Sequence, residues 1–346
     1  MKRHRRGWAL LAIGLVLAGA LAYAFSTNPA WRRFNLDQFL ESFRHVRVGF
    51  LLLAVGVIFS TYAVRALRWR LLLRPMKPDA AFGSVFAATI IGFGAIGVLG
   101  RAAEPVRVYL IARYERTSLS SQLAIWVLER SFDTLVLLAG VIFALGHVAG
   151  ADLPAGDFIS AETQALTRWV AAAIVLILVL LLALRRYYDA GTGKLLDWAH
   201  ALLHAEKLGS LEEGMRLFGE GLHGLRDFKT VFKCIALTIL HWFLVVATFH
   251  VILIGCLPEM QWRLAESTVF TGLIMAGSLL QIPGVGGGFQ VSALLVLTEL
   301  FGVPVEPATT AALLSWLVSF IAVIPAALVL MARRGLRWAN LSELES

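Results

Sequence analysis

The sequence predicts an all-α polytopic membrane protein, and two observations carry this prediction. Of the 346 residues, 58% are hydrophobic and only 16% are charged, and the mean hydropathy is +0.75. Several stretches of about 20 residues have almost no charge, which is the length that an α-helix needs to cross ~30 Å of hydrocarbon. We therefore expect one membrane domain over residues 1–346, in a multi-pass protein of the cytoplasmic or inner membrane of the cell.

Six uninterrupted apolar segments predict about six full transmembrane helices. They lie at residues 8–25, 49–72, 118–147, 168–184, 234–256 and 310–331. The first follows a basic start and contains Ala22 and Ala24, a pattern that also fits a cleavable signal peptide. Because a polytopic chain and no secreted domain follows, we interpret residues 1–25 as a first transmembrane helix or a signal anchor.

Two further apolar stretches, residues 80–116 and 264–302, are interrupted by glycine-rich sequence. The first contains GFGAIGVLG and the second contains PGVGGG. In a helix interior a proline costs about 3 kcal/mol and a glycine about 1 kcal/mol relative to alanine. Each stretch is therefore either a kinked crossing or a re-entrant hairpin that returns to its own side of the membrane.

The distribution of Lys and Arg discriminates between these alternatives, because short cytoplasmic loops carry an excess of basic residues. If both stretches are hairpins, 23 of the 31 Lys and Arg residues fall on the cytoplasmic side. A full crossing by the first stretch would instead place the four arginines between residues 101 and 116 outside. We therefore predict two oppositely oriented re-entrant helical hairpins, cytoplasmic at 80–116 and outside-facing at 264–302, with cytoplasmic N- and C-termini.

The glycine-rich break in the second stretch predicts a substrate-binding tip. In transporters built from inverted repeats, broken helices meet near the midplane, where freed backbone groups coordinate the substrate. The residues of this tip are Pro283, Gly284, Gly286, Gly287 and Gly288, with Gln290 in the half-helix that follows. The alternative is a proline kink whose small residues let two helices pack closely.

Two polar intervals have the pattern of amphipathic helices. In residues 35–46 the apolar side chains share one helical face, and between residues 208 and 225 they recur every three or four positions. The second lies in the longest polar interval, 186–233, which we interpret as a cytoplasmic amphipathic linker. We expect both helices along the bilayer surface, and packing against a partner helix stays open for the second.

Charges near the first hairpin suit an anionic head group. Arg101, Glu104 and Arg107 are spaced by three, which on a helix places the carboxylate between two guanidiniums on one face. Pro105 fits the first turn of a half-helix, whose N-terminus offers free amide donors, and arginines can bind phosphate oxygens in pairs. The alternative is a basic cluster attracted to anionic lipid at the membrane surface.

Three further charges, Glu129, Arg130 and Asp133, lie inside the predicted crossing at residues 118–147. A charge at the centre of a membrane helix costs on the order of 3 kcal/mol, so these side chains need partners or water. Arg130 and Asp133 can pair at i,i+3, as a lock between helices or as a relay for a proton or substrate. Arg65, near the end of an earlier crossing, is interpreted as a side chain that extends to the membrane surface.

Three segments in order, GRAAEPVRVYLIAR, SSQLAIWVLERSFD and IPGVGGGFQ, resemble a flippase-like integral membrane family that includes the transmembrane region of lysylphosphatidylglycerol synthase. The resemblance covers nearly the whole chain and implies a protein that moves or handles lipids. Those lipids are aminoacylated phospholipids in some relatives, and in others lipids of glycosylation or hopanoid pathways. The family pattern carries over to Arg101, Glu104, Arg107, Glu129, Arg130 and Asp133.

The sequence departs from this family pattern in three respects. Gln290 stands where relatives usually carry a glutamate, and Trp316 lies near the position of an arginine expected in the last helix. If those two residues pair in relatives, this chain has lost both partners together, and we expect its substrate to differ accordingly. The sequence also lacks the soluble aminoacyl-transfer domain of the synthase, so the resemblance does not imply lysine transfer.

Three functional hypotheses stay open on this basis. The first is a lipid translocator that holds an anionic or phosphate-containing head group, and the second is a membrane-embedded enzyme with Glu129 or Asp133 as general base. The third is a scaffold that binds lipid-synthesis or lipid-linked glycan-synthesis enzymes. The positive-inside bias accounts for the net charge of +8, so no nucleic-acid partner is expected. Association into a homo-oligomer stays open.

No cofactor or metal is expected. GTGK at residues 191–194 lacks the flanking glycine and the hydroxyl residue of a phosphate-binding loop. His200 and His204 share a helical face but have no third ligand nearby in the sequence. Cys234 and Cys256 lie at either end of one apolar segment, too far apart to form a disulfide within it.

Overall fold

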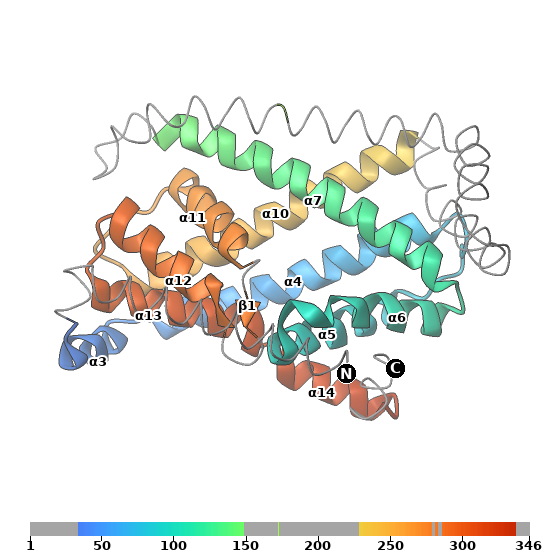
Figure 1. Cartoon of the computed structure of the whole chain (residues 1–346), viewed down its shortest axis with the longest axis horizontal. Coiled ribbons are helices and arrows are strands. Elements are labelled where there is room, and N and C mark those ends of the chain that lie inside the picture. Colours follow the sequence, from blue (N-terminus) through green and yellow to red (C-terminus); the bar gives the residue numbers. More distant parts are fainter. Residues whose placement is uncertain (1–33, 149–171, 173–227, 279–280, 283–285, 337–346) are drawn as a thin grey trace, which may run out of the picture.

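The structure is a computed structural model that describes residues 34–148, 172, 228–278, 281–282 and 286–336 (Figure 1). The described chain is helical apart from one short pair of strands, as predicted. The crossings predicted at 8–25 and 168–184 lie outside the described residues. So do residues 208–225, most of the linker 186–233, and Pro283 and Gly284.

Three long helices run along the length of the molecule: α4 (Val48–Leu73), α7 (Leu119–Val148) and α10 (Phe228–Cys256) (Figure 1). α4 and α10 pack antiparallel, since the backbone N–H of Arg47, at the start of α4, donates to Gly255 O, at the end of α10, at 2.9 Å. The end of α4 meets the start of α7, where Trp69 Nε1 donates to Gln122 Oε1 at 2.8 Å. α10 begins six residues before the predicted crossing, so residues 228–233 belong to the helix and not to the linker.

The first broken stretch forms a helical hairpin of α5 (Phe82–Leu99), a 3₁₀ turn η1 (Gly100–Ala103) and α6 (Glu104–Glu115). The chain reverses at Gly100, whose φ of +70° favours glycine. The two helices pack closely, because a Cβ on Gly92 would lie only 2.6 Å from Arg107 Cβ. The backbone N–H of Ala81 donates to Glu115 Oε2 at 3.4 Å, which brings both ends of the hairpin together.

The second broken stretch also folds back on itself. α11 (Leu264–Gly277) leads to two-residue strands β1 (Gln281–Ile282) and β2 (Gly286–Gly287), followed by α12 (Gly288–Leu295) and a π-helical turn η4 (Val296–Leu300). The strands pair antiparallel at the tip, with Gln281 opposite Gly287. At the other end the rings of Trp262 and Phe301 meet edge to face at 5.1 Å. Both stretches are therefore helical hairpins, and their entry into a membrane from one side stays a prediction.

The last helical segment runs back along the hairpins. It comprises α13 (Val305–Trp316), a π-helical turn η5 (Leu317–Ile321) and α14 (Ile324–Arg333), and it covers the crossing predicted at 310–331. Its end lies beside the start of α5, because Arg334 Nη2 donates to Gly83 O at 3.2 Å. Four helical segments of the described chain are long and apolar enough to cross a membrane: Val48–Leu73, Phe82–Glu115, Lys229–Cys256 and Val305–Arg333.

The amphipathic segment predicted at 35–46 contains a helix, α3 (Leu36–Arg44), which packs on α13. The backbone N–H of Asn35 donates to Glu306 Oε1 at 3.0 Å, and the hydroxyls of Ser42 and Thr310 are hydrogen-bonded. Leu36 and Leu40 are 62% and 55% exposed. An exposed apolar face of this kind is compatible with the bilayer surface that the sequence predicts for it.

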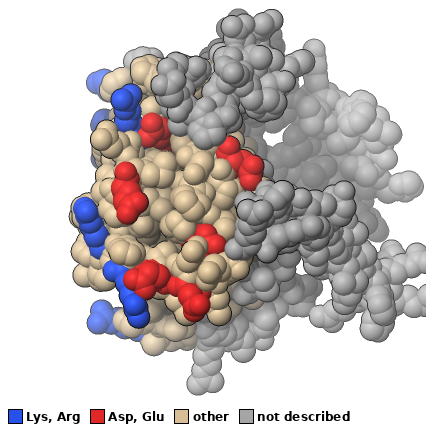
Figure 2. Space-filling view, turned by 90° about the vertical axis from the view of Figure 1, so that its left-hand side faces the viewer, with Lys and Arg blue, Asp and Glu red and all other residues tan. Residues whose placement is uncertain are grey.

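The two ends of the helix bundle differ in charge. We call the end where α4 finishes and α10 begins the basic end, and the opposite end the acidic end. The described residues at the basic end include nine basic and two acidic side chains: Arg70, Arg74, Lys77, Arg113, Arg116, Lys229, Lys233, Arg333 and Arg334, with Asp79 and Glu115. Those at the acidic end include three basic and six acidic ones: Arg44, Arg47 and Arg263, with Asp37, Glu41, Glu259, Glu266, Glu299 and Glu306. Figure 2 looks onto the acidic end and shows acidic side chains spread over it, with basic side chains along one edge.

Candidate functional site

The tips of the two hairpins meet at a polar contact, which we call the latch and which consists of Arg101, Glu104 and Ser278. Arg101, in the η1 turn of the first hairpin, donates from Nε to Ser278 O at 2.7 Å and from Nη2 to Ser278 Oγ at 2.6 Å. Its remaining terminal nitrogen pairs with Glu104 Oε1 at 3.0 Å. Because Ser278 directly follows α11, one guanidinium joins the turns of both hairpins.

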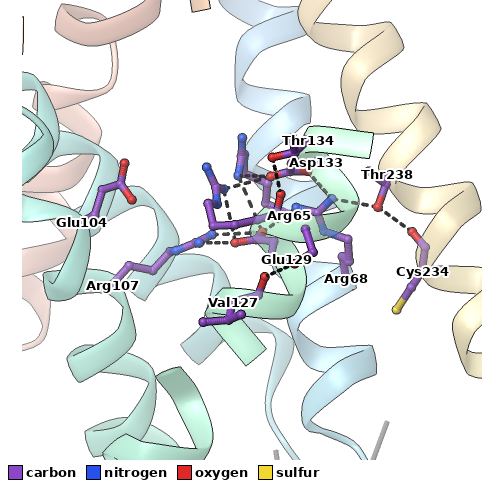
Figure 3. Close-up of polar contacts among 12 residues, drawn as sticks. Arg65, Arg68, Glu104, Arg107, Val127, Glu129, Asp133, Thr134, Cys234 and Thr238 are labelled. Carbon is purple, nitrogen blue, oxygen red and sulfur yellow. Dashed lines mark hydrogen bonds and ion pairs between the residues drawn. The ribbon is translucent and has the colours of Figure 1, made fainter. Parts of the chain in front are cut away.

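A second group of charges lies among α4, α6 and α7, and we call it the charge cluster. Its six members are Arg65, Arg68, Arg107, Glu129, Arg130 and Asp133. Figure 3 labels all of them except Arg130. The carboxylates of Glu129 and Asp133 share a face of α7 at i,i+4. Arg68 of α4 bridges them, with Nη2 at 2.7 Å from Glu129 Oε1 and Nη1 at 2.6 Å from Asp133 Oδ1.

The other arginines approach the same carboxylates from three helices. Arg107 of α6 donates through both terminal nitrogens to Glu129, and its guanidinium lies 4.4 Å from the ring centre of Trp69. Arg130 Nη2 lies 2.9 Å from Asp133 Oδ2, on the same helix. Arg65 Nη1 lies 3.6 Å from Glu129 Oε1 and 3.5 Å from Asp133 Oδ2. Every carboxylate oxygen of the cluster therefore has a guanidinium within ion-pair distance.

The cluster also reaches α10, the helix that packs along α4. Thr238 Oγ1 accepts a hydrogen bond of 2.9 Å from Arg68 Nη1, and its own hydroxyl donates to Cys234 O at 2.7 Å (Figure 3). One helical turn after Thr238 lies His241, which is buried. Four helices, α4, α6, α7 and α10, therefore contribute polar groups to one buried site.

This site lies inside the bundle and not at its surface. The side chain of Arg68 is 0% exposed and that of Glu129 is 1% exposed. Glu129 and Asp133 follow Leu119, the first residue of α7, by about 15 and 21 Å along the helix. Because a buried ion is stable only when it is paired and hydrogen-bonded, the cluster holds α4, α6 and α7 in one arrangement.

The predicted site residues divide between the latch and the charge cluster. The i,i+3 pair of Arg130 and Asp133 is present as expected. The expectation that Glu104 lies between Arg101 and Arg107 is wrong, because Arg107 turns toward Glu129 on the neighbouring helix, and Figure 3 shows Glu104 apart from the cluster. The half-helix α6 does begin at Glu104 with Pro105 in its first turn, as predicted.

The structure corrects one residue and adds another. Arg65 does not extend to the membrane surface as predicted: its side chain is 10% exposed and faces Glu129 and Asp133. Arg68 was not predicted, although it makes the shortest described contact with Asp133. The spacing of Arg65 and Arg68 at i,i+3, matched to Glu129 and Asp133 at i,i+4, is the sequence signal that points to both arginines.

At the tip of the second hairpin, Gln290 has a backbone role. Its Oε1 accepts a hydrogen bond from Gly287 N at 2.9 Å and so caps the start of α12, which begins at Gly288. Gly287 has a φ of +97°, which a side chain with a Cβ adopts only with strain. Trp316 is partly buried against the core cluster that contains Phe289. The described residues contain no group of three or more His, Cys, Asp or Glu that could hold a metal ion.

Comparison with known proteins agrees with the family resemblance seen in the sequence. Residues 9–327 match the family described as the lysylphosphatidylglycerol synthase TM region. A UPF0104 membrane protein of Methanothermobacter thermautotrophicus is 23% identical over 334 residues, which cover 91% of each chain. No solved structure matches. The match and the apolar helices together identify a multi-pass membrane protein.

Proposed function

We propose that this chain, which belongs to the family of lysylphosphatidylglycerol synthase transmembrane regions, translocates an anionic or phosphate-containing lipid between membrane leaflets. The observation that carries the proposal is the latch, in which Arg101 joins the tips of two helical hairpins. Hairpins that meet inside a membrane can form a gate, because separating their tips opens a path between the two sides.

The orientation of the hairpins supports this proposal. The ends of the first hairpin lie at the basic end, near Glu115, and those of the second lie at the acidic end, near Trp262 and Phe301. Since the excess of Lys and Arg marks the cytoplasmic side, the first hairpin enters from the cytoplasm and the second from outside. In this arrangement the two tips lie between the leaflets.

The polar groups at the meeting point suit a lipid head group. The side chains of Arg101 and Arg130 are 33% and 34% exposed, so both arginines lie at the edge of the buried site. A guanidinium binds phosphate oxygens through two parallel hydrogen bonds. A head group that takes Ser278's place on Arg101 therefore breaks the contact between the hairpins. Substrate binding and gate opening are then one event.

The arrangement of the carboxylates does not favour the enzyme hypothesis. A general base needs a lone pair directed at the substrate, and every oxygen of Glu129 and Asp133 already faces a guanidinium. The two carboxylates are better suited to holding arginines in place. The proposed function is therefore transport of an unchanged lipid.

The proposal is tested with purified protein reconstituted into vesicles that contain a labelled anionic phospholipid. Reduction of the label in the outer leaflet measures exchange, and mass spectrometry of the extracted lipids detects any new species. We expect exchange of the labelled lipid with no change in its mass. A new lipid species without exchange would establish the enzyme instead, and neither result would point to a scaffold.

Two variants of the second hairpin make the test specific. Gly287→Val forces a branched side chain onto a backbone with φ of +97° and should reduce exchange strongly at equal protein amount. Leu295→Val introduces the same side chain on the same hairpin at a position that is 40% exposed, and it should leave exchange near the wild-type rate. Equal rates for both variants would mean that the tip does not control transport.

A further inference from the structure

We propose that the charge cluster selects a lipid whose head group carries two negative charges on phosphate, as a phosphate monoester does, over a phosphodiester with one. This inference rests on the proposed function, since it assumes that a lipid head group reaches the cluster.

The described interior of the bundle contains more arginines than carboxylates. Between the basic and acidic ends lie five arginines and three carboxylates: Arg65, Arg68, Arg101, Arg107 and Arg130, with Glu104, Glu129 and Asp133. The latch pair of Arg101 and Glu104 is neutral by itself. The charge cluster therefore has four positive charges against two negative ones and leaves two positive charges without compensation.

Outside the cluster and the latch, the carboxylates of the described residues lie at the two ends of the bundle. Several other membrane segments contain no carboxylate in their sequence. The two predicted crossings outside the described residues, 8–25 and 168–184, contain no Asp or Glu. α5, α10 and α14 contain none either. An uncompensated charge inside a bilayer costs several kcal/mol, so an anion bound at the cluster is the arrangement that the charge count favours.

Several donors of the cluster lack a hydrogen-bond partner within the part of the chain that the structure describes. They are Arg65 Nη1, Arg68 Nε and Arg130 Nε, whereas one acceptor of the cluster, Asp133 Oδ2, makes ion pairs but no hydrogen bond. His241 is 1% exposed and has no partner among the described residues at either ring nitrogen, one turn after Thr238, which bonds to Arg68. Buried polar groups are normally satisfied, so the unpartnered arginine nitrogens on α4 and α7, together with the unpartnered ring of His241 on α10, are independent evidence for a ligand that accepts hydrogen bonds.

Arg130 gives the ligand access to this site. Its side chain is 34% exposed, whereas those of Arg68 and Arg107 are 0% and 6% exposed. Among the described carboxylates, Arg130 Nη2 contacts Asp133 Oδ2 at 2.9 Å and Glu129 Oε2 at 3.5 Å. An entering phosphate can bind Arg130 without removing Arg68 or Arg107 from Glu129, so the framework of the cluster stays intact.

The charge of the head group then decides how well it fits. A phosphate monoester carries about two negative charges near neutral pH and offers three acceptor oxygens, so it neutralises the excess. A phosphodiester such as phosphatidylglycerol carries one and leaves one positive charge, and a zwitterionic head group leaves both. We therefore expect preference to follow the number of negative charges on phosphate.

The test is a competition for the intact reconstituted protein in nanodiscs of phosphatidylcholine. Equal amounts of phosphatidic acid and phosphatidylglycerol with the same acyl chains are added at a pH where the monoester is doubly ionised, and native mass spectrometry counts the lipids that stay bound. We expect phosphatidic acid to be retained about tenfold over phosphatidylglycerol, as one further charge-assisted contact would give. Equal retention would overturn the inference.

Three variants test whether the preference for phosphatidic acid arises at the charge cluster, and the conservative variant among them controls for misfolding. Arg130→Gln removes one positive charge at the accessible edge and should lower the preference to near one, whereas Arg130→Lys keeps the charge and should retain it. Arg70→Gln removes one charge from an exposed position on α4 outside the cluster and should change nothing. If the Arg130→Gln variant keeps the preference for phosphatidic acid, or if the Arg70→Gln variant loses it, the charge cluster is not the site that selects the head group.

Two further arms separate the alternatives. In the first, inorganic phosphate is added at the same concentration as phosphatidic acid. Displacement of phosphatidic acid would show that the cluster binds free phosphate and not a lipid, whereas continued retention of phosphatidic acid would support a lipid as the ligand. Exchange of phosphatidylglycerol and phosphatidic acid at equal rates, with no selective retention, would overturn this inference while the proposed function stands. Selective retention of phosphatidic acid without any leaflet exchange would instead support the inference and contradict the proposed function.

Discussion

Replacing Glu129 by glutamine tests how much of the stability of the bundle depends on the charge cluster. Glu129 is 1% exposed, and its carboxylate lies within ion-pair distance of Arg65, Arg68, Arg107 and Arg130. The substitution keeps the size of the side chain and removes its charge. The uncompensated positive charge of the cluster then rises from two to three, at a site where the side chains of Arg68, Arg107 and Asp133 are at most 6% exposed.

The expected loss follows from the number and burial of these contacts. Removing one partner of a buried ion pair costs about 3 to 5 kcal/mol, because the remaining charge stays buried. Glu104→Gln is the matched control, since it removes the same charge from a side chain that is 20% exposed and that, among the described residues, makes an ion pair with Arg101 alone, at 3.0 Å. Partly exposed pairs contribute about 1 kcal/mol or less.

The assay is reversible unfolding in mixed micelles with increasing denaturing detergent, followed by tryptophan fluorescence. We expect Glu129→Gln to lower the free energy of unfolding by at least about 2 kcal/mol more than Glu104→Gln does. Adding Arg65→Gln to Glu129→Gln lowers the uncompensated charge from three back to two and should recover part of that loss. Little is lost with Arg65 itself, because its Nη1 makes ion pairs but no hydrogen bond among the described residues. Equal stability of the Glu129 and Glu104 variants would refute the reasoning.

Three further predictions concern packing, topology and the latch. Gly92→Ala should destabilise the protein by about 1 to 3 kcal/mol in the same unfolding assay, because the new Cβ would lie 2.6 Å from Arg107 Cβ. The control is Gly83→Ala on the same helix, whose Cβ meets nothing within 4 Å and which should be neutral or stabilising. Cysteines at Lys77 and Arg116 should be labelled by a membrane-impermeant reagent from the same side, and one at Asp157 from the opposite side; labelling of 77 and 116 from opposite sides would show that the first hairpin crosses the membrane. Arg101→Lys should slow lipid exchange less than Arg101→Gln, because lysine keeps the charge but cannot make the two contacts of the guanidinium with Ser278; equal rates for the two variants would contradict this.

Local sequence features predict the two hairpins well. Gly100 permits the φ of +70° at the first reversal, and the positions of Pro105 and of α12 follow from the preference of prolines for helix starts and of glycines for tight turns. The charge bias predicts that both ends of each hairpin lie together, and the contacts of Ala81 with Glu115 and of Trp262 with Phe301 agree with this. These features depend on a few neighbouring residues, which is why the sequence reveals them.

The partners of the buried charges are harder to predict, because they depend on how helices rotate against one another. Glu104 and Arg107 are neighbours on one helix face, yet the close packing at Gly92 and the ring of Trp69 direct Arg107 toward α7. Arg65 and Arg68 lie near the end of an apolar segment, where basic side chains usually extend to the surface. Only the contact between α4 and α7 shows that both arginines turn inward to Glu129 and Asp133.

The gate formed by the hairpin tips is tested most directly by joining the tips covalently and measuring lipid exchange. Cysteines replace Ala102 of η1 and Gln281 of β1, two elements of the opposing tips that contact each other, so that Arg101 and Ser278 stay in place. The native Cys234 and Cys256 are replaced by serine, and a cleavable bifunctional maleimide joins the two new thiols. The account predicts that lipid exchange in reconstituted vesicles stops while the tips are joined and returns when the linker is cleaved. Exchange at an unchanged rate with the tips joined would contradict it.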